Sequence, residues 1–150
     1  MSSTHQKISV WISLTLTWAM LAGLVVAAIG LPFALPWYFR FMGMLQKPLF
    51  WTGVLLYAAL VPAAVACISL LRLLGNVRAG SVFQPTSARY LRLLSWCCFF
   101  ECAIFAALSF WFVSAPFIAL GVGFIGLMLR VVKNVIEEGT RIKSENDFTV

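Results

Sequence analysis

Four long apolar runs, separated by short stretches that hold almost all of the charged residues, form the hydrophobic pattern of this chain. As helices that rise 1.5 Å per residue, runs of this length suit the roughly 30 Å hydrocarbon layer of a membrane. The predicted spans cover residues 8–31, 49–71, 93–113 and 116–132. The pattern therefore predicts an all-α integral membrane protein, with residues 1–150 forming one four-helix domain.

Three polar or mixed segments connect and follow these spans: an outer loop at 32–48, a cytoplasmic loop at 72–92 and a cytoplasmic tail at 133–150. The outer loop is aromatic and contains two prolines, so we expect a short helix or turn in the membrane interface.

Glycine and proline predict where helices end and begin in the other two segments. Gly75 and Asn76 can close the second span with a left-handed cap, and Gly139 can cap an extension of the fourth span. Pro85 suits the first turn of a helix that continues into the third span, and Pro116 suits the first turn of the fourth.

Composition agrees with lipid as the solvent, because 62% of the 150 residues are hydrophobic. The chain has 11 Lys and Arg against 5 Asp and Glu. In a soluble protein this excess would suggest nucleic acid. Here the basic residues flank the apolar runs, where they orient a membrane protein, so no direct binding of nucleic acid is predicted.

The basic residues are divided unequally between the two sides of the predicted membrane. One side has only Arg40 and Lys47. The other side has Lys7, Arg72, Arg78, Arg89, Arg92, Arg130, Lys133, Arg141 and Lys143. The excess of Lys and Arg marks the cytoplasmic side. We therefore predict a multi-pass protein of the cell inner (plasma) membrane, with both termini inside and two helical hairpins joined by the basic loop.

Small residues recur every fourth position in all four spans, which allows helix backbones to approach closely in lipid. The first span contains Ala19, Gly23 and Ala27. The corresponding residues of the others are Ala59, Ala63 and Cys67, then Cys98, Cys102 and Ala106, then Ala119 and Gly123. This pattern predicts a tight four-helix bundle.

Glu101 is the only acidic residue inside a predicted span, and an ionised carboxylate there costs at least about 2.5 kcal/mol. Thr17 lies at a similar depth, as does the Ala58 carbonyl, which Pro62 leaves free because proline has no N–H. One interpretation is a neutral carboxyl in an interhelical hydrogen bond, and the other is a proton-linked or cation-linked site. Both stay open from the sequence.

No set of residues with the spacing of a catalytic, metal or cofactor site occurs in the sequence. There is no Ser/His/Asp set and no glycine-rich phosphate loop, and the adjacent Cys97 and Cys98 cannot share one helix face with Glu101. We therefore predict a protein that is not an enzyme and needs no metal or cofactor.

Two groups of cytoplasmic residues are candidates for interaction. Arg78, Arg89 and Arg92 lie in the loop, where they are either a topology signal against anionic lipid or a docking surface for an acidic partner. In the tail the basic residues come first and the acidic residues second, and the candidates are Glu145, Asn146 and Asp147. The alternative for the tail is a solvated segment without a partner.

Two regions of the chain resemble a bacterial membrane-protein family, domain of unknown function 2975. The first region runs from Gly80 to Pro85 and from Leu91 to Trp96; the second comprises Glu138 and Gly139, then Glu145 to Val150. No activity is implied by the resemblance. It does imply a partner, because members are often encoded beside a small helix-turn-helix regulator.

Two functions follow from these observations. The first is a non-enzymatic regulatory or scaffolding membrane protein that binds a cytoplasmic protein, such as a helix-turn-helix regulator, through the loop and tail. The alternative is a small transporter or channel that works as a homo-oligomer and uses Glu101. The first is favoured because nearly all polar residues lie outside the spans.

Overall fold

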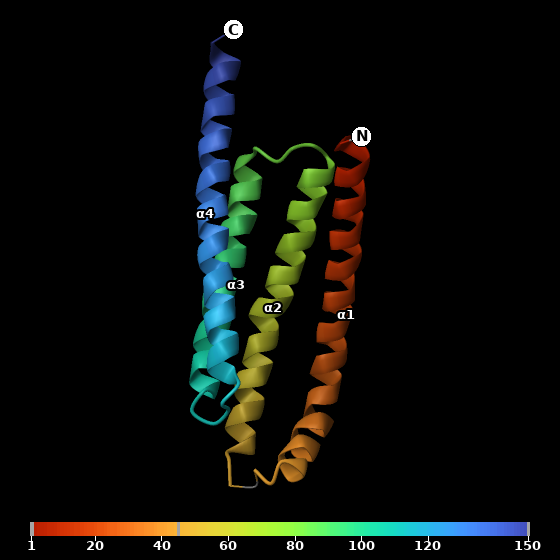
Figure 1. Ribbon diagram of the computed structural model, residues 1–150, viewed down its shortest axis with the longest axis vertical. Helices are drawn as coiled ribbons and strands as arrows, with labels where there is room; N and C mark the ends of the chain where they lie inside the picture. Colours follow the sequence, from red (N-terminus) through yellow and green to blue (C-terminus); the bar gives the residue numbers. More distant parts are fainter. Residues whose placement is uncertain (1, 45, 150) are drawn as a thin grey trace.

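The computed structural model describes residues 2–44 and 46–149, and these residues form four antiparallel helices (Figure 1). Their bounds are α1 (Ser2–Phe41), α2 (Leu49–Arg78), α3 (Pro85–Leu108) and α4 (Ala115–Phe148). All four are long and apolar enough to cross a membrane, which confirms a multi-pass membrane protein. Leu45 of the predicted outer loop and Val150 of the predicted tail lie outside the described residues.

The start of α1, the end of α4 and the connection between α2 and α3 lie at one end of the molecule, which we call the basic end (Figure 1). The other two connections, between α1 and α2 and between α3 and α4, lie at the opposite end. The helices therefore form two hairpins, as predicted from the four spans.

The first helix is longer than its predicted span, so residues 32–41 of the predicted outer loop are helical instead. Pro32 and Pro36 lie inside α1 without ending it. The helix ends at Phe41, where Gly43 takes a φ of 65° and the Met44 N–H donates to the Phe39 carbonyl at 3.0 Å. Only 42–48 connects α1 to α2.

The predicted cap at Gly75 and Asn76 is wrong, because α2 continues to Arg78. Gly80 closes the helix instead: its φ is 73°, and the Ser81 N–H donates to the Asn76 carbonyl at 3.0 Å. The connection to α3 is therefore 79–84, much shorter than the predicted loop at 72–92. Pro85 begins α3 as predicted.

The predicted cap at Gly139 is also wrong, because α4 continues through this residue to Phe148. Pro116 does lie in the first turn of α4, as predicted. The C-terminal part of α4 extends past the ends of the other three helices at the basic end (Figure 1). The predicted tail is thus mostly a continuation of the fourth helix.

Close packing joins α3 to α4, where small residues of the two helices face each other. An added Cβ on Gly123 would lie 3.1 Å from the Cys102 Sγ, and one on Gly126 would lie 3.1 Å from the Cys98 Cβ. The small residues of the third and fourth spans therefore allow the close approach that their spacing predicted.

The helices pack in the order of the sequence, α1 on α2, α2 on α3 and α3 on α4. Among the described residues, no close backbone approach joins α1 to α3 or α4, so the tight packing that the sequence predicted is found between neighbouring helices only. The small residues Ala19, Gly23 and Ala27 of α1 are all exposed. The molecule is a row of four helices, and the side between α1 and α4 is open.

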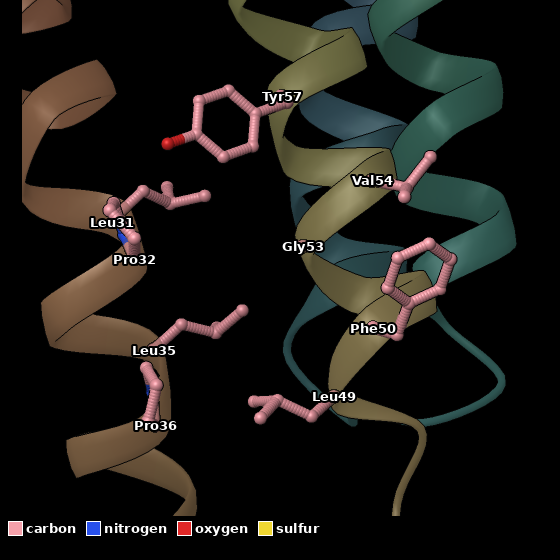
Figure 2. A pocket seen from close by; sticks show the side chains of 9 residues that line it. All are labelled: Leu31, Pro32, Leu35, Pro36, Leu49, Phe50, Gly53, Val54 and Tyr57. Atoms are coloured by element: carbon pink, nitrogen blue, oxygen red, sulfur yellow. The ribbon is translucent and has the colours of Figure 1, made fainter.

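Hydrogen bonds from side chains connect helices at the opposite end. The Lys47 Nζ donates to the Trp111 carbonyl and thereby joins the α1–α2 connection to the α3–α4 connection. The Tyr57 hydroxyl of α2 points toward α1 (Figure 2) and donates to the Ala28 carbonyl at 2.9 Å. Pro32 lies four residues after Ala28 and has no N–H, so this carbonyl lacks its helical partner. Tyr57 supplies the missing hydrogen bond.

An apolar pocket of about 430 Å³ lies beside this hydrogen bond, between the parts of α1 and α2 nearest to the connection that joins them. Leu31 and Leu35 point from α1 toward α2, and Leu49 points back toward α1 (Figure 2). No charged residue lines this pocket. The groove described next differs because its lining includes Glu101.

Candidate functional site

A cavity of about 720 Å³, which we call the groove, receives residues from all four helices. Its lining is apolar except for Glu101 and two cysteines. Gly23 contributes no side chain from α1, and an added Cβ there would have nothing within 4 Å. The groove exists because α1 packs closely only on α2, which leaves space between α1 and the two helices α3 and α4.

Glu101 lines the groove from the middle of α3 and is half-buried. Its Oε1 atom is buried and has no hydrogen-bond partner in the part of the chain that the structure describes. The carboxyl lies beside the backbone of Ala63 in α2. The structure therefore brings Glu101 to α2, but without a hydrogen bond that satisfies Oε1.

The two other predicted members of the intramembrane site do not meet Glu101. Thr17 is buried against α2, and its Oγ1 donates to the Ser13 carbonyl of its own helix at 2.7 Å. Pro62 is half-buried, and the described hydrogen bonds include none from Glu101 to the Ala58 carbonyl. Of the three residues, only Glu101 faces the groove.

All four cysteines are free thiols. Cys67 of α2 and Cys98 of α3 line the groove, while Cys97 is buried and Cys102 lies against Gly123. Within residues 2–44 and 46–149, no cluster of three or more His, Cys, Asp or Glu side chains has the geometry of a metal site.

A second candidate surface lies at the basic end, where the connection 79–84 meets α4. Phe83 packs on Gly139: a Cβ added to this glycine would lie 2.5 Å from the Phe83 Cε1. The two regions that carry the family resemblance therefore come together in space. The glycine that sequence analysis interpreted as a helix cap is instead a contact site for an aromatic ring.

The candidate arginines of the loop have different environments. The Arg78 guanidinium lies over the Trp11 ring at 4.5 Å. Arg92 pairs with Glu137 of α4 at 3.2 Å, and both side chains are exposed. Arg89 is exposed and makes no ion pair with any residue that the structure describes. Only Arg89 is thus uncommitted within the molecule.

The tip of α4, residues 141–149, extends past the other three helices (Figure 1). Every described residue from 141 to 149 is exposed, including the candidates Glu145, Asn146 and Asp147. The base of this extension is held by the Phe83 ring and by the Arg92–Glu137 pair. The result is a helix fixed at its base with all of its sides free at the tip.

One polar site inside the helices was missed from the sequence. The fully buried Ser95 donates to the Gly126 carbonyl at 3.0 Å and accepts from the Arg130 Nε at 3.3 Å. The Arg130 guanidinium also lies 5.2 Å from the centre of the Trp96 ring. The sequence does contain a signal for this site, because Ser95 in the third span lies at the depth of the basic Arg130 in the fourth.

Comparison with known proteins gives one match. No curated protein and no solved structure matches the chain. A family model described as "Protein of unknown function (DUF2975)" matches residues 9–150, nearly the whole chain. The chain therefore belongs to this family, as its loop and tail residues indicated.

Proposed function

We propose that the protein is a non-enzymatic regulatory or scaffolding protein of the cell inner membrane, and that it binds a cytoplasmic protein at the basic end. The observation that carries the proposal is the tip of α4, where residues 141–149 are exposed around a helix that is fixed at its base. A helix that is already formed and fixed at its base presents its side chains on a defined surface before binding. Its ordering cost on binding is therefore low.

The chemistry of the tip suggests the class of partner. The basic Arg141 and Lys143 precede the acidic Glu145 and Asp147, so the acids lie farther from the membrane. The family resemblance implies a small helix-turn-helix regulator, and DNA-binding proteins carry a basic face. Acidic groups at the tip are complementary in sign to such a face. Binding here would compete with DNA and would hold the regulator at the membrane.

Affinity purification from native membranes tests this proposal. The tagged parent protein is compared with a variant that carries Glu145→Ala, Asn146→Ala and Asp147→Ala, because alanine preserves the helix. Arg40→Ala, at the opposite end, is the matched control. We expect one cytoplasmic protein to co-purify with the parent and the control, to be lost with the tip variant, and to bind again when both proteins are purified.

Two results would overturn this function. One is a parent protein that captures no cytoplasmic protein above the level of an unrelated membrane protein. The other is a captured protein that binds the tip variant and the parent equally. Release of the partner by DNA that contains its binding site would support the helix-turn-helix class.

The groove supports a second candidate function, a small transporter or channel that works as a homo-oligomer. The supporting observation is the half-buried Glu101 carboxyl, whose Oε1 has no partner among the residues that the structure describes. Ionisable groups inside membranes commonly mark ion or substrate pathways. Proteoliposomes that contain the parent or Glu101→Gln test it. Proton flux that depends on Glu101 supports transport, and equal flux in both excludes it.

A further inference from the structure

We propose that the groove binds a hydrophobic amine, with the protonated nitrogen paired to the Glu101 carboxylate and the apolar body placed between α1 and α4. This binding is independent of the docking function proposed for the basic end, because the groove lies among the spans. It also does not require transport.

The size and lining of the groove fit such a ligand. Its volume of about 720 Å³ lies within the range of sites for drug-sized molecules, which is about 300–1,000 Å³. The walls are apolar side chains of all four helices, and Gly23 leaves open space on the side of α1. A compact hydrophobic body therefore fits without movement of a helix.

Apolar contact alone cannot select a ligand here, since lipid tails are as apolar as the groove. Selection must come from the one acidic residue. The Glu101 side chain lines the groove, and its buried Oε1 atom has no partner among the described residues. A rotation of the carboxyl would present this oxygen to an N–H donor in the groove and satisfy it. A protonated amine supplies both the donor and the opposite charge. An alcohol supplies only the donor, and a quaternary ammonium ion supplies only the charge.

Proton balance follows from the cost of a lone charge in lipid. In the empty groove the carboxyl is neutral, because no basic side chain lines the cavity to compensate an ionised form. When an ammonium ion binds, the O–H bond of the carboxyl breaks and its proton leaves to water. The carboxylate and the ammonium ion then form the pair. One proton is released for each ammonium ion bound, so binding should tighten as pH rises.

The other titratable groups near the carboxyl are thiols. Cys67 faces the groove from α2, and Cys97 and Cys98 lie beside Glu101 on α3. On α4, the lining residues are Val122, Ile125 and Leu129, while Arg130 is turned toward Ser95 and Trp96. Measurements between about pH 6 and about pH 8 keep unperturbed thiols mostly neutral, so Glu101 is the group that changes charge.

The test uses the full chain in nanodiscs of zwitterionic phosphatidylcholine, with radiolabelled dodecylamine as the probe and dodecanol as its neutral match. Glu101→Gln should weaken amine binding by about tenfold or more and remove its pH dependence, with no effect on dodecanol. Gly23→Leu should fill the groove and weaken amine binding. Gly30→Leu is the matched control, because an added Cβ there also meets nothing within 4 Å and Gly30 does not line the groove.

The outcomes that overturn the proposal are distinct. Amine binding equal to that of empty nanodiscs means that there is no site. Equal binding to the parent and to Glu101→Gln means that the carboxyl takes no part. Equal affinity of the parent for amine and dodecanol means apolar contact only. If Glu101→Gln fails to fold, the two glycine variants decide: equal amine binding in Gly23→Leu and Gly30→Leu places the ligand outside the groove.

Discussion

The hydroxyl of Tyr57 supplies a hydrogen bond that a proline removes from another helix. Pro32 removes the N–H that would bond the Ala28 carbonyl, and lipid offers no water to replace it. Tyr57 reaches across from α2 and donates to this oxygen at 2.9 Å. A proline in α1 and a tyrosine in α2 are thus one structural unit, which explains how α1 remains a helix through Pro32.

Tyr57→Phe should destabilise the protein by about 0.6 to 1.7 kcal/mol, which are the average and the maximum for interhelical hydrogen bonds in lipid. In a Pro32→Ala background the alanine N–H can bond the Ala28 carbonyl, so the same substitution should cost less. Unfolding in mixed micelles measures both values. Equal costs in the two backgrounds would show that the hydroxyl acts independently of the proline.

Gly139 illustrates the opposite case, in which a residue matters because it has no side chain. The Phe83 ring occupies the space that a Cβ would need, with Cε1 only 2.5 Å from that position. Glycine in a helix interior costs about 1 kcal/mol relative to alanine. The contact with Phe83 compensates that cost and fixes the connection 79–84 against α4.

Gly139→Ala should therefore have opposite effects in two backgrounds. In the parent it should displace Phe83, and amide hydrogen exchange in 79–84 should become faster. In a Phe83→Ala background the clash is absent, so the same change should stabilise α4 by about 1 kcal/mol through helix propensity. A stabilising effect of similar size in both backgrounds would mean that Phe83 does not depend on this glycine.

At the scale of elements, the sequence predicted where helices begin better than where they end. Pro85 and Pro116 each lie in the first turn of a helix, because proline has no N–H to leave unbonded there. Gly75 and Gly139 were interpreted as helix ends, and both lie inside helices. Glycine permits a cap but does not require one. The true cap, Gly80, is identified by its φ of 73°, which no sequence displays.

The first turns of α3 contain the one candidate arginine that is not engaged within the molecule. Arg78 contacts Trp11 and Arg92 pairs with Glu137, whereas Arg89 is exposed without an ion pair to any described residue. A basic residue near an anionic membrane surface contributes about 1 kcal/mol of attraction. Substitution of Arg89 is therefore the best test of whether the arginines contact lipid or a protein partner.

Arg89→Gln should reduce retention of anionic phospholipid by about fivefold, the equivalent of about 1 kcal/mol, if the arginines contact lipid. Arg92→Gln is the matched control, because its arginine is already paired with Glu137. Native mass spectrometry of the purified protein measures the retained lipid. Unchanged lipid retention together with lost partner capture would assign Arg89 to protein docking instead.

At the scale of the whole molecule, the sequence predicted four membrane helices but not their arrangement. Small residues at every fourth position occur in all four spans, and the pattern cannot tell which of them face another helix. Those of α3 and α4 do, with Gly126 close to Cys98, whereas Gly23 of α1 faces open space. A closed bundle and an open row have the same sequence pattern. The groove follows from this arrangement, as does the Glu101 Oε1 atom that has no partner in the described part of the chain. The sequence could therefore identify Glu101 but not the cavity.

The two ends of the molecule differ in charge, and this difference predicts the orientation in the membrane. Arg40 and Lys47 are the only basic residues of the opposite end, and the Lys47 Nζ is already bonded to the Trp111 carbonyl. All other Lys and Arg lie toward the basic end. The connections are short, which is the condition under which Lys and Arg counts determine orientation. The basic end should therefore face the cytoplasm.

Labelling with a membrane-impermeant thiol reagent tests this orientation, in a background where the four native cysteines are replaced by alanine. Val113→Cys lies in the α3–α4 connection at the opposite end and is highly exposed, so it should be labelled in intact cells. Ser144→Cys lies in the exposed tip of α4 and should be labelled only after permeabilisation. The reverse pattern would place the tip outside the cell. That result would also exclude a cytoplasmic partner at the tip. Amine binding would be unaffected, because the groove lies among the spans and is reached from the membrane in either orientation.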